Sequence, residues 1–412
     1  MAGSASAETL PVTIQDIERA RGVLEGIVRR TPLVRAPELP GLAGADLYLK
    51  LENLQVTGAF KIRGAVNRLS QLSEEAARRG VIAASAGNHA QGVAWAARAR
   101  KVPATIVMAR SASPLKVEAT EALGAKVVLH GADYEEAHEE AMRRAVEDRL
   151  TYIHPFDDPA VIAGQGTVGL EIVDDLPNVR RVIVGVGGGG LMAGIGIAVK
   201  ARRPDADLVA VQPTGADTLR ASLTEGRVVV GGRPSTFADG LATRHVGDAP
   251  LRILRSLGAR GFVADDRSIA RAVFLLLEKG KILAEGAGAA PIAALLDHPE
   301  LAKDGPVVAV VSGGNLDPFV LDRVLFIGLS AEGRLLWIRS ALRDTPGTLR
   351  EFLEVAAAAS ANVRRIDHDR ESPERPPGMV TVELELEVRD AEHGEAVLAA
   401  YHERGYVVER RA

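Results

Sequence analysis

Short apolar runs alternate along the chain with longer segments whose apolar residues recur every three or four positions. The runs of strand length are 47–50, 81–84, 104–108, 126–129, 181–184, 207–211 and 306–311. The segments of helical period are 162–173, 191–201, an alanine- and glutamate-rich stretch after residue 129, and two that begin near Asn88 and Pro114. Strand and helix in alternation predict parallel strands with right-handed crossovers. For 412 residues, two α/β domains with a cleft between them fit better than one sheet.

Both ends of the chain have a different pattern. Thr13 to Val28 has the spacing of an amphipathic helix, with Thr13 as N-cap and Asp16 three residues later. Beyond residue 325 the order βαββαβ is ferredoxin-like, and it contains a strictly alternating strand at 381–388. We expect strands at 335–339, 362–368, 380–388 and 406–409, helices at 347–358 and 391–402, and a proline-rich turn at 372–377. This pattern predicts a separate small domain.

Composition excludes several classes of partner. Hydrophobic residues make up 47% of the chain and charged residues 25%, and no apolar run approaches the length of a membrane span. The formal net charge is -4 and the basic residues are scattered, so no nucleic-acid surface is expected. The absence of cysteine removes disulfides and thiolate metal sites. Met1 to Ala7 has no signal-peptide character, so we expect a cytoplasmic protein without membrane contact.

Lys61 lies in an apolar setting, between Phe60 and Ile62, with Gly58 and Gly64 three residues to either side. Burial would lower the pKa of its ammonium group, as an amine nucleophile or base requires. A surface lysine that opens a helix explains the same residues. The choice between the two interpretations depends on the other motifs of the chain.

The run Gly187-Gly188-Gly189-Gly190 follows the apolar strand 182–186 and opens a helix that begins at Leu191. Converging backbone N–H groups at a helix N-terminus suit a phosphate, whereas a tight turn alone would rarely need four glycines. The loop lacks the Lys-Ser/Thr ending of a nucleoside-triphosphate site, and no ribose-binding carboxylate follows about 20 residues later. The pattern therefore favours phosphate binding over dinucleotide binding.

Two further polar stretches follow strands. The loop Ser85-Ala86-Gly87-Asn88-His89 offers backbone N–H groups with hydroxyl and amide side chains, which suit a carboxylate or a phenolic oxygen; helix capping is the alternative. Ser312 to Asn315 begins where the strand 307–311 ends, and open α/β sheets place ligands there. The stretches 285–289 and 237–240 are weaker signals that a helix start and a tight turn explain.

In this order the motifs resemble the threonine dehydratase branch of the fold-type II (tryptophan-synthase-β-like) pyridoxal phosphate enzymes, over residues of about 10 to 322. The resemblance implies two open, mostly parallel sheets with helices on both faces, in a region 1–325 whose small subdomain, about 53–155, is inserted in the larger one. It implies that Lys61 bonds covalently to pyridoxal 5'-phosphate, with Phe60 and Arg63 beside it. The other implied contacts are the cofactor phosphate at Gly187 to Gly190 and Leu191, the ring oxygen at Asn88, the pyridine nitrogen at Ser312, and the substrate carboxylate at Ser85, Ala86, Gly87, Asn88 and His89.

The activity implied is dehydration and deamination of L-threonine to 2-oxobutanoate and ammonia, and of L-serine to pyruvate. Lys61 would be the base that removes the α-proton. A hydroxyl at Ser312, unlike a carboxylate, would not keep the ring nitrogen protonated, which favours prompt loss of the β-hydroxyl over transamination. Whether the cofactor phosphate or a water protonates the leaving hydroxyl stays open, as does the preference between threonine and serine.

Departures from related enzymes narrow the activity. Serine racemases place a catalytic serine where this chain has Ala86, and they bind a divalent cation through a Glu-Pro where this chain has Gln212-Pro213. Cysteine synthases carry Thr-Ser-Gly-Asn in place of the loop from Ser85 to His89. We therefore expect no metal and little racemisation or β-replacement. L-Serine dehydratase or serine racemase is the alternative among enzymes, and a catalytically idle amino-acid sensor is the alternative outside them.

The segment 326–412 resembles an ACT regulatory domain, through the turn Asp344-Thr345-Pro346-Gly347-Thr348-Leu349 and the strand that starts at Asn362. Such domains often bind an effector amino acid at a subunit interface. The resemblance implies isoleucine or valine as the effector, feedback if the role is biosynthetic, and a homodimer or homotetramer. The implied effector contacts are Asp344, Gly347, Leu349 and Asn362. A dimerising domain without a ligand is the alternative.

Overall fold

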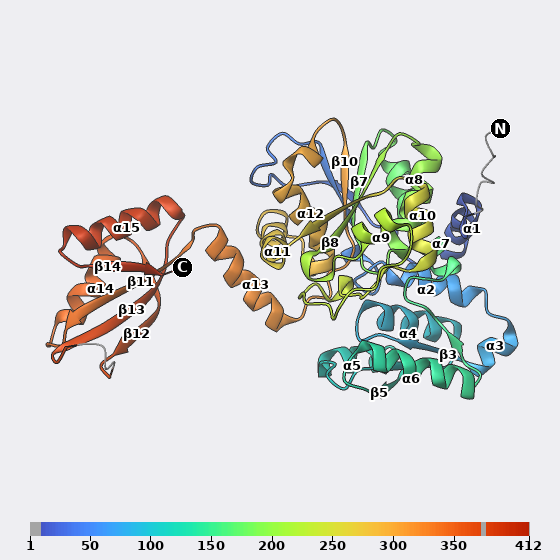
Figure 1. Cartoon of the computed structure of the whole chain (residues 1–412), viewed down its shortest axis with the longest axis horizontal. Coiled ribbons are helices and arrows are strands. Elements are labelled where there is room, and N and C mark those ends of the chain that lie inside the picture. Colours follow the sequence, from blue (N-terminus) through green and yellow to red (C-terminus); the bar gives the residue numbers. More distant parts are fainter. Residues whose placement is uncertain (1–9, 372–375, 412) are drawn as a thin grey trace. The chain divides into compact units, whose positions relative to one another are not determined.

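The structure is a computed structural model that describes residues 10–371 and 376–411. The chain forms two units, which divide between Val320 and Leu321 (Figure 1). The division falls within the helix α13 (Pro318–Ala331). The first unit contains two α/β sheets and the second a single antiparallel sheet.

The larger sheet of the first unit has the strand order β1-β2-β10-β7-β8-β9. Only β1 is antiparallel to its neighbour; the other neighbours are parallel, as predicted. The strands are β1 (Leu33–Arg35), β2 (Leu47–Leu51), β7 (Arg181–Gly185), β8 (Asp207–Pro213), β9 (Arg260–Ala264) and β10 (Val307–Val311). The sequence did not reveal β1 and β9: β1 has only three residues, and β9 begins with Arg260 and Gly261, so neither edge strand gives a continuous apolar run.

Helices cover both faces of this sheet. One face packs Val182, Val184 and Val308 against α1, α7, α8 and α10, and the other packs against α12, which in turn contacts α11. These helices and the short α9 are α1 (Ile14–Leu24), α7 (Pro159–Asp175), α8 (Gly190–Arg202), α9 (Leu219–Glu225), α10 (Asp248–Ser256), α11 (Asp266–Gly280) and α12 (Gly286–Asp297). The sheet is therefore buried on both sides, as parallel sheets usually are.

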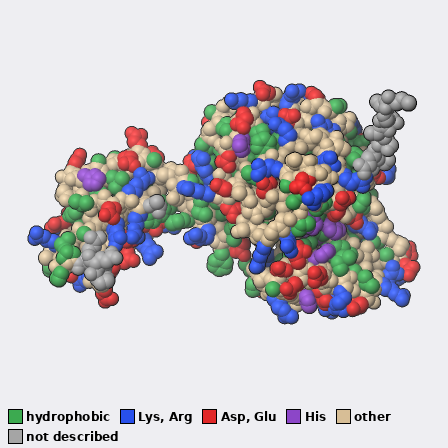
Figure 2. All heavy atoms as spheres, viewed as in Figure 1, with side chains coloured by type: hydrophobic (Ala, Val, Ile, Leu, Met, Phe, Trp, Pro, Cys, Tyr) green, Lys and Arg blue, Asp and Glu red, His purple; other side chains and the backbone are tan. Residues whose placement is uncertain are grey.

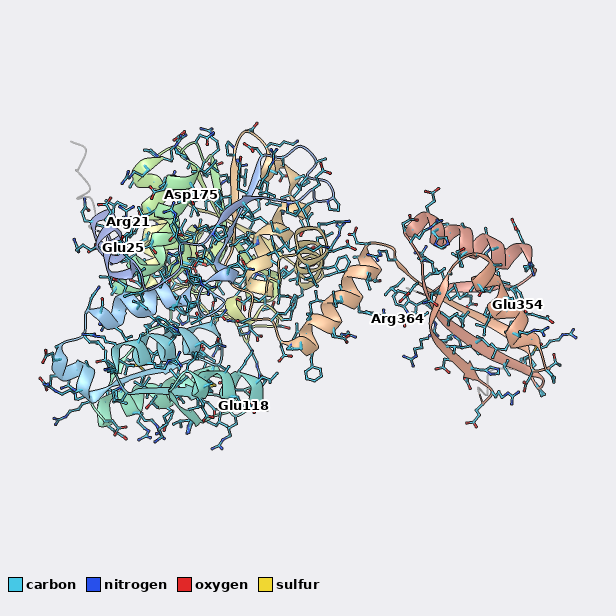
Figure 3. All side chains as sticks on the ribbon, turned by 180° about the vertical axis from the view of Figure 1, so that it is seen from behind. Arg21, Glu25, Glu118, Asp175, Glu354 and Arg364 are labelled. Atoms are coloured by element: carbon cyan, nitrogen blue, oxygen red, sulfur yellow. The ribbon has the colours of Figure 1, made fainter. Side chains whose placement is uncertain are left out.

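The first helix confirms the predicted capping box. The Thr13 amide donates to Asp16 Oδ2 at 2.8 Å, and the Thr13 hydroxyl oxygen accepts from the Asp16 amide. The helix ends at Leu24, four residues before the expected Val28, because the chain reverses at Gly26, where φ is +71°. Arg21 of α1 reaches Asp174 of α7 at 3.4 Å; Figure 3 labels Arg21 and the neighbouring Asp175.

The smaller sheet has the order β5-β4-β3-β6 with parallel neighbours throughout. Its strands are β3 (Val81–Ala84), β4 (Ala104–Met108), β5 (Lys126–Leu129) and β6 (Thr151–Tyr152). Ala83 and Ile106 pack on the face toward α2 and α4, whereas Ile82 and Val107 pack against α6. The helices here are α2 (Lys61–Ser70), α3 (Glu74–Arg79), α4 (Asn88–Arg100), α5 (Pro114–Ala122) and α6 (Tyr134–Glu147). The two-residue β6 was not predicted because it is too short to give a pattern.

The second unit is an antiparallel sheet of order β12-β13-β11-β14, covered by two helices that pack on Leu336, Val382 and Leu384. This order is that of the ferredoxin-like fold expected from the sequence. Its elements are β11 (Leu335–Arg343), α14 (Thr348–Ala358), β12 (Asn362–Asp369), β13 (Met379–Glu387), α15 (Ala391–Glu403) and β14 (Val408–Arg411). β11 runs four residues past the predicted Arg339, because its alternation continues in register with β13 as far as Arg343. β14 starts two residues later than the predicted Tyr406, whose ring instead packs on Phe352.

Parts of two predictions lie outside the described residues: the segment Met1 to Ala7 and most of the proline-rich turn 372–377. Within the described ranges, no helix combines the length and apolar character that crossing a bilayer requires. Figure 2 shows acidic and basic side chains interspersed over the face that it draws. That face therefore has no basic stripe of the kind that nucleic-acid binding uses.

Candidate active site

Three of the predicted site segments follow neighbouring strands of the larger sheet. β2, β10 and β7 lie side by side, and the chain continues from their carboxyl ends into Lys61, Ser312 and the glycine run. Ala59 forms an antiparallel bridge with Gly313, and the Phe60 amide donates to the Ser312 carbonyl at 3.1 Å. The sheet therefore brings together segments that lie about 250 residues apart in sequence, at the edge where open α/β sheets bind ligands.

Lys61 is the first residue of α2, and its side chain is half-buried. Its Nζ donates to the Pro155 carbonyl at 2.7 Å and lies 5.2 Å from the centre of the Phe60 ring. Burial lowers the pKa of Lys61 to about 8, although the nearby carboxylate of Glu285 acts in the opposite direction. A lysine does open a helix here, but its amine turns inward and is easier to deprotonate than a surface amine.

The glycine run has no room for side chains. A Cβ on Gly188 would lie 2.1 Å from Cγ of Phe156, and one on Gly190 would lie 2.7 Å from the Phe156 carbonyl oxygen. Gly189 has φ +92°, which favours glycine, and α8 begins at Gly190. The first N–H groups of a helix have no carbonyl partner within it, so the bare backbone here can receive an oxyanion. Leu191 is buried in the first turn of α8.

Asn88 does not act as a helix cap. The N-cap of α4 is Gly87, which makes no side-chain capping bond. The Asn88 amide instead makes two long-range contacts: Nδ2 donates to Glu285 Oε1 at 2.7 Å, and Oδ1 accepts from Asn315 Nδ2 at 2.7 Å. The capping alternative is therefore wrong for Asn88, whose side chain connects the tip of β3 to residues that come after β9 and β10.

Ser85 and His89, in the same loop, have different environments. The Ser85 hydroxyl oxygen accepts from the Gly87 amide at 3.1 Å, which holds the turn before the helix. His89 is 3% exposed, and its Nε2 lies 2.9 Å from the Ile153 carbonyl. A carbonyl only accepts, so this nitrogen carries the proton. Burial, together with the charge of Lys61, lowers the pKa of His89 to about 3, so the ring is neutral; Nε2 bonds to the Ile153 carbonyl, and the buried Nδ1 has no hydrogen-bond partner among the described residues.

Arg63 lies two residues after Lys61 and is 1% exposed. Its guanidinium donates to Glu52 Oε2 at 2.8 Å and to Glu171 Oε1 at 2.7 Å. Lys50, fully buried, contacts the other oxygen of Glu171 at 2.6 Å. The two cations and two carboxylates balance in charge and join the start of α2 to β2 and α7. They hold in place the helix turn that carries Lys61.

Sequence reasoning missed three contributors to this site. Pro155 and Phe156 act through a backbone carbonyl and a ring, which no motif indicates. Glu285 was noted only as part of a helix start, yet its carboxylate contacts Asn88, and burial raises the pKa of Glu285 to about 7. A carboxylate directly before the glycine- and alanine-rich stretch 286–290 was the available signal.

Gln212 occupies the place where the sequence departs from the cation-binding pattern of racemases. It is 1% exposed, and its Oε1 accepts from the amides of Thr218 and Leu219 at 3.0 and 2.7 Å. The side chain therefore holds the start of α9. This structural bond uses the oxygen that a metal ligand would need.

In the second unit, three of the four expected effector residues line one cavity of about 240 Å³. Asp344, Gly347 and Leu349 contribute to it, together with His368 and Arg370. Asn362 does not: it lies at the opposite end of β12, where its Nδ2 contacts Glu387 at 3.3 Å. Within one copy of the chain, the turn from Asp344 to Leu349 lines the cavity but Asn362 does not. The turn lies at the carboxyl end of β12, near His368, whereas Asn362 is the first residue of that strand.

These groups fit a cofactor that carries both an aldehyde and a phosphate. The half-buried amine of Lys61 suits the aldehyde, the glycine run suits the phosphate, and Asn88 and Ser312 offer an amide and a hydroxyl. The family described as "Pyridoxal-phosphate dependent enzyme" matches residues 24–313. The L-threonine ammonia-lyase of Thermotoga maritima is 44% identical over 96% of this chain and 99% of its own. The chain belongs to the pyridoxal-phosphate dependent enzyme family, and its cofactor is pyridoxal phosphate.

Two solved structures of the same fold are also similar to the chain. Processed threonine deaminase isoform 2 of Solanum lycopersicum matches with a TM-score of 0.73 and 35% identity, over 79% of this chain and 93% of that one. The serine racemase of maize matches with a TM-score of 0.72 and 33% identity, over 78% of this chain and 99% of that one. The fold alone therefore does not separate elimination from racemisation.

Proposed function

We propose that this protein is an L-threonine ammonia-lyase that converts L-threonine to 2-oxobutanoate and ammonia, and L-serine to pyruvate. The observation that carries the proposal is the position of Lys61, whose half-buried amine lies on the Pro155 carbonyl with its pKa lowered to about 8. The similarity to an L-threonine ammonia-lyase over nearly the whole chain supports the choice of substrate. Incubation with L-threonine and with L-serine, with assay of both oxo acids, tests it.

Lys61 has two roles in this proposal. Its amine would hold the cofactor covalently until the amino group of the substrate displaces it, and the freed amine would then be the base that removes the α-proton. Bound pyridoxal phosphate supplies a conjugated ring that withdraws electrons from the α-carbon. Loss of the α-proton and the β-hydroxyl as water leaves an enamine, which water hydrolyses to the oxo acid and ammonia. A lowered lysine pKa favours this chemistry, because only the free amine can accept the proton.

The surrounding residues bind and orient. The backbone of Gly187 to Gly190 and Leu191 would hold the cofactor phosphate, with Phe60 beside the lysine. Asn88 would donate to the ring oxygen, and Ser312 would serve the ring nitrogen. The loop from Ser85 to His89 would bind the substrate carboxylate through its backbone N–H groups and the Ser85 hydroxyl, whose oxygen accepts from the Gly87 amide and whose hydrogen can still be donated.

Elimination is favoured over racemisation at this site because Ala86 offers only a methyl group. A racemase needs a second proton carrier on the other face of the substrate, and a methyl group cannot supply one. We expect D-serine to form far more slowly than pyruvate when L-serine is the substrate. Chiral analysis of the products distinguishes the two activities: D-serine forming faster than pyruvate would identify a racemase.

The cavity at Asp344, Gly347 and Leu349 is proposed as an effector site for isoleucine or valine. Leu342, Leu349 and Val380 supply an apolar lining for a branched side chain, and the N-terminus of α14 beside Gly347 suits a carboxylate. Asn362 would complete the site only from a second copy of the chain. Calorimetric titration with isoleucine and with valine tests this, and Leu349→Arg should remove binding without changing the rate on threonine in the absence of effector.

A homodimer or homotetramer is proposed as the working form. The helix segment 321–331 supports it, because Leu321, Leu325 and Ile327 are only half-buried in a largely apolar sequence. Light scattering after gel filtration measures the assembly, and a monomer at working concentration would contradict the proposal. A cytoplasmic location is also proposed and is tested by cell fractionation.

A further inference from the structure

Four residues from four separate segments form a continuous series of hydrogen bonds beside Lys61. Asn315 Nδ2 donates to the Thr57 carbonyl at 2.8 Å and to Asn88 Oδ1 at 2.7 Å. Asn88 Nδ2 in turn donates to Glu285 Oε1 at 2.7 Å. The Thr57–Asn315–Asn88–Glu285 chain connects the loop before α2, the end of β10, the start of α4 and the start of α12.

The Thr57 carbonyl fixes which atoms donate and which accept in the whole series of hydrogen bonds. A backbone carbonyl can only accept, so the Asn315 atom that faces it is the nitrogen. The second N–H of that nitrogen points to Asn88, whose nearest atom must then be the oxygen. The other end of the Asn88 amide, its nitrogen, consequently faces Glu285, and Glu285 accepts the bond whether its carboxyl is ionised or carries a proton on the other oxygen.

This arrangement leaves Asn88 with one uncommitted donor. An amide nitrogen carries two N–H groups, and Glu285 takes one of them. The amide oxygen is already occupied by Asn315. The side chain can therefore offer a ligand an N–H but not a carbonyl oxygen, which is the polarity that an anionic ring oxygen requires.

Two glycines, Gly58 and Gly313, lie directly against the side chains of Asn315 and Glu285 in this hydrogen-bond series. A Cβ on Gly58, where φ is +73°, would lie 2.4 Å from Asn315 Oδ1. A Cβ on Gly313 would lie 2.4 Å from Glu285 Oε1. The Glu285 amide also donates to the Gly313 carbonyl at 3.0 Å, so the carboxylate and its backbone are both fixed on this segment. The glycines thus make room for the two side chains that flank Asn88.

We propose that Asn315 and Glu285 are positioning residues that orient the Asn88 amide, so that its free N–H faces the cofactor ring oxygen. This inference rests on the proposed role of Asn88 in cofactor binding. Neither residue needs to touch the cofactor: Asn315 acts by occupying the amide oxygen, and Glu285 acts by accepting one of the two N–H groups. Loss of either lets the amide rotate and present its oxygen to an oxygen, which is repulsive.

A purely structural role makes a different prediction. If this series of hydrogen bonds only stabilises the contact between the four segments, disrupting it should lower the stability of the protein. Any loss of cofactor affinity should then be the same whether or not Asn88 is present. If it acts through Asn88, the effect on cofactor affinity should disappear once Asn88 is removed, since the two sites are then no longer coupled.

The test is a double-mutant cycle on the dissociation constant of pyridoxal phosphate, measured without substrate from the visible absorbance band of the bound cofactor. Asn315→Asp replaces the donor by an acceptor in nearly the same volume, and Asn315 is exposed, so the fold should tolerate it. We expect this substitution to raise the dissociation constant about tenfold, the effect of one charge-assisted hydrogen bond, and to shift the band. In the Asn88→Ala background it should change the constant by less than about twofold.

Substitutions of Glu285 provide a second, independent test of the proposal. Glu285→Met removes the acceptor and should weaken cofactor binding about tenfold, whereas Glu285→Gln keeps an acceptor oxygen and should restore binding to within about twofold of wild type. Wild-type affinity and band position in both Asn315→Asp and Glu285→Met would overturn the inference. Equal losses with and without Asn88 would do so as well. A wild-type protein that gives no cofactor band at all would instead contradict the proposed function.

Discussion

The Nζ of Lys61 lies 2.7 Å from the carbonyl oxygen of Pro155, although 94 residues separate the two in sequence. The next residue along, Phe156, packs its ring against Gly188 of the glycine run. The segment 155–156 thus contacts the amine on one side and the phosphate loop on the other. It connects the end of the smaller sheet, which leads out of β6, to the catalytic edge of the larger one.

The bonding of pyridoxal phosphate to the cofactor-free protein should become faster with rising pH through about 8, the value to which burial lowers the pKa of the free Lys61 amine. Below that pH the amine is protonated and cannot attack the cofactor aldehyde, so the rate constant should fall about tenfold for each further unit of pH. The measurement is the rate at which the visible absorbance band of the bound cofactor appears after mixing, between about pH 6 and about pH 9.5. A rate that is flat across this range would show that the Lys61 amine does not titrate there.

The stability of the cofactor-free protein should depend on Glu285 in a pH-dependent way. Burial raises the pKa of Glu285 from 4.5 to about 7, so the fold favours the protonated form. Its contribution is therefore present below about pH 4.5 and is lost as the pH rises through about 7. Glu285→Gln does not titrate, so it should become more stable than wild type by about 2 kcal/mol above neutral pH, allowing for partial exposure, and should show little difference near pH 5.

Urea unfolding of the cofactor-free Glu285→Gln and wild-type proteins near pH 5 and pH 8 measures this difference. Glu118→Gln, at an exposed position on α5 (Figure 3), is the matched control for the loss of one carboxylate. A gain of the same size in the control would reveal a general charge effect and contradict a role for burial at Glu285.

Removal of Arg63 should be among the most destabilising single substitutions in the first unit. Arg63→Met removes the guanidinium that contacts both Glu52 and Glu171, so the buried carboxylate of Glu52 loses its ion pair, and a buried charge without its partner costs about 3–5 kcal/mol. Urea unfolding gives the value. The control is Arg78→Ala, which removes an exposed ion pair with Glu74 and should cost less than about 1 kcal/mol. Equal effects in the two variants would contradict a stabilising network around Arg63.

A single methyl group in the glycine run should weaken the phosphate site. In Gly188→Ala the new Cβ would lie 2.1 Å from the Phe156 ring, so either the ring or the loop must move. We expect the dissociation constant of pyridoxal phosphate to rise at least about tenfold, equivalent to about 1.4 kcal/mol. Gly232→Ala is the control, because a Cβ there meets nothing within 4 Å. Unchanged cofactor affinity in Gly188→Ala would place the phosphate elsewhere.

Much of the site could be predicted because its parts follow strands. The motifs around Lys61, Asn88, Gly187 and Ser312 each carry small or polar residues at a strand end, which a periodicity analysis detects. The strand bounds 81–84, 104–108 and 126–129 match the structure at both ends, because each run is short, rich in apolar and β-branched residues, and separated from the next by a helical segment.

The remaining contributors could not be found in this way because their roles arise only from tertiary contact. Pro155 acts through its backbone carbonyl, which every residue has. Glu285 begins a helix, as acidic residues often do, and only the meeting with Asn88 distinguishes it from an ordinary helix start. His89 shows a different limit: its sequence position predicts substrate binding, which stays a prediction, whereas the contact of its Nε2 with the Ile153 carbonyl arises only in the fold.

The most direct test of the account is the reaction of the purified protein with L-threonine, compared with that of Lys61→Ala at the same cofactor concentration. We predict that wild type forms 2-oxobutanoate and ammonia in equal amounts, and that Lys61→Ala loses activity about 1000-fold together with the covalently bound cofactor. Absence of 2-oxobutanoate from the wild type, or an unchanged rate in Lys61→Ala, would contradict it.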